Sequence, residues 1–219
     1  MDMQPLAEMI IEQGLRDRVL SEDQLARIAG GSDARRYGLV NRALKSRDLV
    51  RVRRGLYVLA RRYRSELAHP FAIAQALQPG SYVSFETALS TRGWIPERVH
   101  TTASVIPGRK SSVVEHPDFG NFSFSPLALH RDRFLELIER QQIGSQVALV
   151  ARPLRALIDL VAQRKLEWQG LDWLIEGMRI EESNLRTVKA ADVEALAGTY
   201  KQKAPNAFLA RFVKEFRLD

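Results

Sequence analysis

The first part of the chain carries apolar residues at spacings of three and four, the pattern of helices with one buried face. A first helix is predicted over residues 5–19, with Pro5 in its first turn. A second helix begins after Ser21, because Gln24 follows at the spacing of a capping box, and it ends at Gly30 and Gly31. The apolar residues that these helices are expected to bury include Leu6, Met9, Ile10, Leu25, Ile28 and Ala29.

A third, strongly basic helix follows at once, capped by Ser32 or Asp33. Its apolar residues at spacings of three and four, which are predicted to face inward, are Tyr37, Val40 and Leu44. The residues predicted on or near its outer side are Arg35, Arg36, Leu39, Arg42 and Lys45.

Residues 49–59 predict a β-hairpin, because apolar and basic residues alternate up to a turn at Arg54 and Gly55. Two short helices joined by a glycine turn, the second of them basic, are typical of a helix-turn-helix, whose second helix enters the major groove of DNA. A basic hairpin directly after that helix is typical of a wing. Residues 1–65 are therefore predicted to form a winged helix-turn-helix domain. The alternative is an ordinary edge ribbon whose arginines only serve solubility.

The remaining residues, 66–219, predict a larger C-terminal domain of helices and short strands. The chain is therefore assigned to the α+β class: an N-terminal winged helix-turn-helix followed by a mixed α/β domain with a short antiparallel sheet and several helices. Strands are predicted at 82–83, 100–106, 111–115, 121–124 and 147–150. Helices are predicted at 71–77, 84–94, 129–143, 154–166, 168–178, 187–196 and 207–216.

The charge of the chain is concentrated at its N-terminal end. The whole sequence of 219 residues has a formal charge of +7. Residues 31–64 alone hold eleven Lys or Arg and two Asp, for a local charge of +9. Residues 1–65 sum to +6 and residues 66–219 to +1. Such asymmetry favours a nucleic-acid-binding module attached to a domain with another task.

Composition excludes several other classes of protein. The chain has no cysteine, which excludes disulfides, thiolate metal sites and cysteine nucleophiles. No stretch resembles a signal peptide or a membrane span, so a cytoplasmic protein without membrane association is expected. Neither a Gly-x-x-x-x-Gly-Lys loop nor a Gly-x-Ser-x-Gly elbow occurs. The sequence thus predicts no catalytic residue, no metal and no cofactor.

Some polar residues nevertheless invite a chemical interpretation. Glu115, His116 and Asp118 could be drawn as a metal site or a nuclease carboxylate cluster, although the adjacent Pro117 and Gly120 favour an ordinary polar turn. Asp159 interrupts the apolar face of a helix and is either paired with Arg155 or placed at the edge of that face. Further polar residues, interpreted as a strand end and a helix cap with its first turn, are Ser81, Ser84 and Glu86. The large aromatic residues Trp94, Trp168 and Trp173 are expected in the core.

Several segments taken together resemble one known family. These segments are RVRRGLYVLA at the hairpin, PGSYVSFETALSTRGWIPE and VHTTASVIPGR after it, and the helix ARPLRALIDLVA. They resemble the AbiEi family of antitoxins and transcriptional regulators, which belong to type IV toxin-antitoxin and abortive-infection operons that act in phage defence. The resemblance covers most of residues 20–165 and adds little over the last fifty or so.

The resemblance implies a DNA-binding autorepressor rather than an enzyme. Such a protein binds inverted repeats in its own promoter through the winged helix, and two separate monomers could fill the repeats. The C-terminal domain, residues 66–219, would counteract a nucleotidyltransferase-like toxin, directly or indirectly.

The residues predicted to contact double-stranded DNA come from the basic helix and the hairpin. The helix residues are expected to contact base edges or adjacent phosphates, whereas the hairpin residues are expected to contact the phosphate backbone. The predicted set is Arg35, Arg36, Arg42, Lys45, Arg51, Arg53 and Arg54. Two alternatives stay open. One is a nuclease whose metal-dependent cleavage is lost on changing Asp118 or Glu115, and the other is a toxin-binding module that does not bind DNA.

Overall fold

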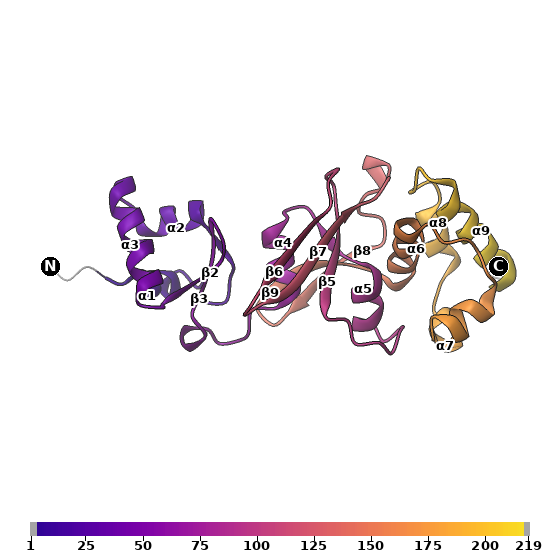
Figure 1. Cartoon of the computed structure of the whole chain (residues 1–219), viewed down its shortest axis with the longest axis horizontal. Coiled ribbons are helices and arrows are strands. Elements are labelled where there is room, and N and C mark those ends of the chain that lie inside the picture. Colours follow the sequence, from indigo (N-terminus) through magenta and orange to yellow (C-terminus); the bar gives the residue numbers. More distant parts are fainter. Residues whose placement is uncertain (1–3, 217–219) are drawn as a thin grey trace. The chain divides into compact units, whose positions relative to one another are not determined.

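The computed structural model describes residues 4–216, which divide into two compact units (Figure 1). The first unit comprises the chain up to residue 79, with residues 116–119 and 142–147. The second comprises residues 80–115, 120–141 and the chain from 148 onward. Helices and strands occur in both, which confirms the α+β class. The predicted domain boundary at residue 65 stays a prediction, and each unit is described by itself.

The helices of the first unit begin and end largely where local signals place them. They are α1 (Leu6–Glu12), α2 (Glu22–Ala29) and α3 (Asp33–Lys45). The predicted capping box of α2 is confirmed, since the Ser21 hydroxyl accepts from the Gln24 amide at 3.2 Å and the Gln24 side chain accepts from the Ser21 amide at 2.9 Å. The first helix is shorter than predicted, because the chain turns at Gly14, whose φ of 69° is left-handed.

α1, α2 and α3 pack against one another around a common core. Its buried residues are Leu6, Ala7, Ile10, Leu20, Leu25, Ala29, Leu39, Ala43, Leu49, Tyr57 and Leu59. The predicted inner face of α3 is correct for Val40 and Leu44, which pack against this core, but wrong for Tyr37 and Leu39. Leu39 is only 3% exposed, whereas Tyr37 is 73% exposed. The small side chain of Ala43, one turn from Leu39, allows α3 to approach the core closely.

A small antiparallel sheet completes this part of the first unit. Its strands are β1 (Leu20–Ser21), β2 (Leu49–Arg53) and β3 (Leu56–Leu59), in the order β1-β3-β2. The β2–β3 pair is the predicted hairpin. A β-bulge between Arg51 and Arg53 shifts the register, so Val52 is buried while Val50 is half-buried. The predicted alternation holds from Val50 to Arg53, because Arg51 and Arg53 are exposed and the two valines are not.

Polar contacts fix the base of the hairpin and the segment that follows it. The Asp48 carboxylate accepts from the Tyr63 hydroxyl at 2.7 Å and pairs with Arg62. Burial alone would raise the pKa of Asp48, but its hydrogen bonds with Ser46, Tyr63 and Arg62 lower that pKa below its ordinary value. A short 3-10 helix, η1 (Arg61–Tyr63), leads on to α4 (Pro70–Leu77).

The second sheet is larger and more mixed than the predicted short antiparallel sheet. Within the described chain its order is β6-β7-β5-β4-β9-β8. β4 pairs antiparallel with β5 but parallel with β9, and β5 pairs parallel with β7. The strands are β4 (Tyr82–Val83), β5 (Thr101–Ile106), β6 (Ser112–His116), β7 (Gly120–Pro126), β8 (Ile138–Ile143) and β9 (Gln146–Ala151). The predicted strands here are confirmed, with ends shifted by a few residues.

The predicted helix over residues 129–143 is wrong. This stretch holds a 3-10 turn, η2 (Arg131–Arg133), and then β8. Gly144, with a φ of 58°, lies in the short turn between β8 and its neighbour β9. Pairing with β9 therefore overrides the local helical tendency of the Leu, Glu and Arg residues, as often happens in sheets.

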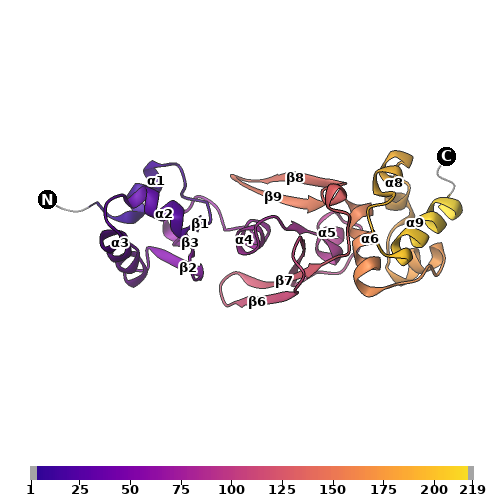
Figure 2. The same ribbon diagram turned by 90° about the horizontal axis from the view of Figure 1, so that it is seen from above.

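Helices of the second unit gather around α6 (Pro153–Arg164), which contacts both α5 (Phe85–Thr91) and α9 (Lys203–Phe216) (Figures 1 and 2). Between α6 and α9 lie η3 (Trp173–Gly177), α7 (Glu182–Leu185) and α8 (Ala190–Leu196). The helix predicted over 168–178 is shortened to residues 171–177, of which the last five form the π-helical turn η3. Trp94 is buried, and Trp168 is half-buried against Phe208.

A buried ion pair lies at the centre of the second unit. Arg155 and Asp159 on α6 are both fully buried, and Arg155 Nε donates to Asp159 Oδ1 at 2.9 Å. The first of the two predicted settings for Asp159, pairing with Arg155, is therefore confirmed. Three hydroxyl groups also donate to this carboxylate, from Ser84 at 2.7 Å, Tyr82 at 3.0 Å and Tyr200 at 2.7 Å.

This polar cluster joins segments that are far apart in the chain. Arg155 Nη1 also donates to the Glu136 carbonyl at 2.9 Å. Burial and the neighbouring Asp159 charge raise the pKa of both Tyr82 and Tyr200 well above the ordinary value. Burial alone would lower the pKa of Arg155, but Asp159 raises it above the ordinary value. Ser84 makes no capping hydrogen bond with its side chain, so its predicted role as a cap is replaced by the bond to Asp159.

Candidate nucleic-acid interface

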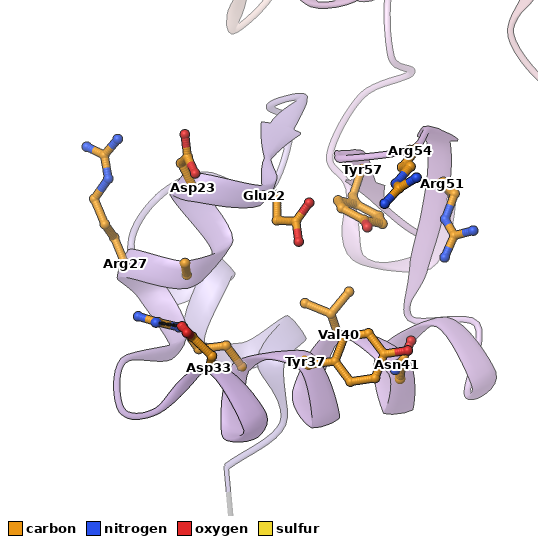
Figure 3. A pocket seen from close by; sticks show the side chains of 12 residues that line it. Glu22, Asp23, Arg27, Asp33, Tyr37, Val40, Asn41, Arg51, Arg54 and Tyr57 are labelled. Carbon is orange, nitrogen blue, oxygen red and sulfur yellow. Dashed lines mark hydrogen bonds and ion pairs between the residues drawn. The ribbon is translucent and has the colours of Figure 1, made fainter.

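A groove of about 960 Å³ opens between α2, α3 and the β2–β3 hairpin (Figure 3). We call it the hairpin groove. All of its lining residues belong to the first unit. α2 contributes Glu22, Asp23, Ala26 and Arg27, α3 contributes Asp33, Arg36, Tyr37, Val40 and Asn41, and the hairpin contributes Arg51, Arg54 and Tyr57.

Backbone contacts hold the walls of the groove in place. The Glu22 amide, at the start of α2, donates to the Gly55 carbonyl in the hairpin turn at 2.9 Å. Gly55 has a φ of 79°, a conformation that glycine adopts without strain. The capping box at Ser21 fixes the same end of α2. The hairpin and the helices therefore form one framework around the groove.

Three of the predicted DNA-contacting residues line this groove: Arg36, Arg51 and Arg54. Arg36 forms an ion pair with Asp33, one turn earlier on α3. The Arg51 guanidinium carbon lies 6.0 Å from the centre of the Tyr57 ring, a cation–π contact across the hairpin. No ion pair joins Arg51 or Arg54 to another residue of the described chain, so both are available to an anion.

The other predicted residues, Arg35, Arg42, Lys45 and Arg53, are exposed but do not line the groove. Arg35 and Arg42 are seven residues apart, two helical turns, and so lie on one side of α3. The buried residues Leu39 and Ala43 separate that side from Arg36. Basic residues thus flank α3 on both sides.

The sequence did not single out several residues of the groove. The sequence pattern predicts Tyr37 in the core, and it does not mark Asn41 or the α2 residues Glu22, Asp23 and Arg27. Asn41 could have been found from its spacing of four from Tyr37, once Tyr37 is placed outside. The α2 residues could not, since their position depends on how α2 packs against the hairpin.

The hairpin groove is less basic than residues 31–64, which contribute most of its lining residues. Four arginines on its walls face three acids, so its formal charge is +1. Glu22 points into the space toward Tyr57 (Figure 3). Positive charge is therefore highest along the margins of the groove, on the hairpin and on the far side of α3, rather than at its centre.

No group of three or more His, Cys, Asp or Glu residues in the described chain is arranged to hold a metal ion. None of the helices at residues 4–216 is both long and apolar enough to cross a membrane. Comparison of the sequence with protein-family models and with curated proteins found no match.

Proposed function

We propose that this protein is a cytoplasmic, sequence-specific DNA-binding repressor, whose first unit acts as a winged helix. The observation that carries the proposal is the hairpin groove. A basic helix and a basic hairpin form its adjacent walls, and arginines without ion-pair partners among the described residues lie on the hairpin side.

The dimensions of α3 support this assignment. An α-helix with its side chains is about 10–12 Å wide and fits the major groove of B-DNA, which is about 12 Å wide. Phosphates run along both edges of that groove. Arg35 and Arg42 on one side of α3, and Arg36 on the other, would each face one strand of phosphates. Arg51 and Arg54 on the hairpin would continue the contact along the neighbouring backbone.

We further propose that the protein serves as the antitoxin of a toxin-antitoxin operon. This part of the proposal depends on the resemblance of residues 81–93 and of α6 to AbiEi-type regulators. The second unit would then counteract a nucleotidyltransferase-like toxin, by contact or indirectly, while the first unit represses the shared promoter. Co-expression with the product of the adjacent gene, followed by growth measurement, tests this role.

DNA binding is tested by fluorescence anisotropy with a duplex from the promoter upstream of the protein's own gene. A scrambled duplex of equal composition measures non-specific binding. The native protein is expected to bind the promoter duplex at least about a thousandfold more tightly than the scrambled one. The double variant Arg51→Ala/Arg54→Ala should weaken both.

A matched control is available in the second unit. Arg109 and Lys110 are adjacent, exposed residues between β5 and β6, and replacing both by alanine removes the same charge. This control should bind like the native protein. If the native protein binds neither duplex, or if both double variants lose affinity equally, the hairpin groove is not the DNA-binding surface.

A further inference from the structure

The outward side of α3 carries the uncharged residues Tyr37, Gly38 and Asn41 between its two basic flanks, and the exposed Lys45 follows Asn41 one turn later. Tyr37 is 73% exposed and Asn41 follows it one turn later. Both line the hairpin groove. Among the residues that the structure describes, no hydrogen bond or ion pair is made by the side chain of Tyr37 or of Asn41. The Tyr37 hydroxyl is thus presented outward, Asn41 is half-buried on the next turn, and neither side chain is used by the fold.

Between these two residues lies Gly38, in the middle of a helix. Glycine lowers helix stability relative to alanine, and it is favoured where a backbone needs a left-handed conformation or a close approach. Gly38 does not have a left-handed φ. A Cβ atom placed there would lie 3.7 Å from Arg42 Nη1, which is an ordinary contact with a flexible side chain. The packing of the protein itself therefore does not require glycine at this position.

We propose that Tyr37, Gly38 and Asn41 form the base-reading strip of this protein, a proposal that rests on the DNA-binding function above. Duplex DNA is the occupant that fits the charge pattern, because the strip is neutral where base edges would lie and basic where phosphates would lie. Arg35, Arg36 and Arg42 are then positioning residues that hold α3 along the groove.

The chemistry of the strip matches base edges in the major groove. An asparagine amide both donates and accepts, and it can bind N6 and N7 of adenine together. The Tyr37 hydroxyl can donate to or accept from a neighbouring base, and its ring can contact a thymine methyl group. Gly38 lets the helix backbone approach the bases between these two side chains. Asn41 therefore specifies an adenine, and Tyr37 reads an adjacent base pair.

The test uses the full chain and a set of promoter duplexes, each with one base pair changed. The native protein should prefer one base pair at the position that Asn41 reads. Asn41→Ala should lower that preference by about 5- to 150-fold, the discrimination of one bidentate contact, while binding to a scrambled duplex stays unchanged. Tyr37→Ala should alter preference at a neighbouring position. Circular dichroism checks that each variant folds, as expected because Tyr37 is exposed and Asn41 is only half-buried.

Arg35→Ala is the matched comparison on the same helix. It should weaken binding to all duplexes by a similar factor and keep their ranking, since phosphates carry no sequence information. If Asn41→Ala and Tyr37→Ala also keep the native ranking, the strip is not the base-reading surface, although DNA binding itself stands. If the native protein binds no duplex, the DNA-binding proposal fails and the strip with it.

Gly38→Ala provides a second and independent measurement. It should raise the melting temperature of the free protein, because alanine favours the helix. It should also weaken binding to the preferred duplex, because a methyl group would meet the base edges. A variant that is more stable and binds that duplex as tightly as the native protein would show that α3 does not approach DNA closely at this position.

Discussion

The buried pair of Arg155 and Asp159 leads to a sharp prediction for stability. Asp159→Ala removes the acceptor of four hydrogen bonds and leaves the Arg155 charge buried without its counter-charge. Breaking such a pair costs about 3–5 kcal/mol of the free energy of unfolding. Since whole domains are stable by about 5–15 kcal/mol, the second unit should lose much of its stability.

Urea unfolding followed by tryptophan fluorescence measures this loss in the second unit. All three tryptophans of the chain belong to that unit: Trp94, Trp168 and Trp173. With a slope of about 2 kcal/mol per molar urea, the midpoint should fall by about 2 M. The control Asp172→Ala changes an exposed aspartate of the same unit and should shift the free energy by less than about 0.5 kcal/mol.

A double variant separates the charge effect from a general loss of packing. Replacing Arg155 by Met and Asp159 by Leu together removes both charges and keeps most of the volume. This variant should be more stable than Asp159→Ala, because no unpaired charge remains in the interior. If Asp159→Ala costs less than about 1 kcal/mol, or if the double variant is the less stable of the two, the assigned role of the pair is incorrect.

Three further predictions concern pH, groove charge and capping. The raised pKa values of Tyr82 and Tyr200 mean that the folded state keeps protons which the unfolded state loses above about pH 10. Below that pH, these groups should not make the stability of the second unit depend on pH. Above it, the free energy of unfolding should fall by about 1.4 kcal/mol per pH unit for each tyrosine. Urea titrations between pH 9 and 11.5 measure this fall. Glu22→Gln removes a negative charge from the hairpin groove and should strengthen binding to every duplex in anisotropy titrations, whereas Glu8→Gln on α1, outside the groove, should have little effect. Ser21→Ala breaks the capping box and should cost about 1 kcal/mol of stability in the first unit. Amide hydrogen exchange in α2 measures this loss, and unchanged exchange there would contradict the capping role.

Local signals were sufficient to predict the start and end of α2 and the start of α3. A capping box and two consecutive glycines act through hydrogen bonds and backbone conformations within a few residues, so they can be read directly from the sequence. The rotation of α3 could not be predicted in this way. Two apolar stripes compete on that helix, one through Tyr37 and one through Leu39, and packing against α1 and α2 decides between them.

The same limit explains the missed strand β8. Its residues favour a helix when taken alone, and only pairing with β9 makes them a strand. In the candidate site, the hairpin arginines could be predicted because the turn at Gly55 marks them. Glu22 could not, because its place in the groove follows from the contact between the start of α2 and that turn.

In the proposed function, the hairpin groove binds the backbone and bases of duplex DNA. Its most direct test is the slope of the logarithm of the binding constant against the logarithm of salt concentration, measured with the promoter duplex. The Arg51→Ala/Arg54→Ala variant should flatten that slope by about 1.8. Each phosphate contact that is lost lowers the number of counterions released on binding by about 0.9. The Arg109→Ala/Lys110→Ala control should keep the native slope. Equal slopes for the native protein and the Arg51→Ala/Arg54→Ala variant would contradict the claim.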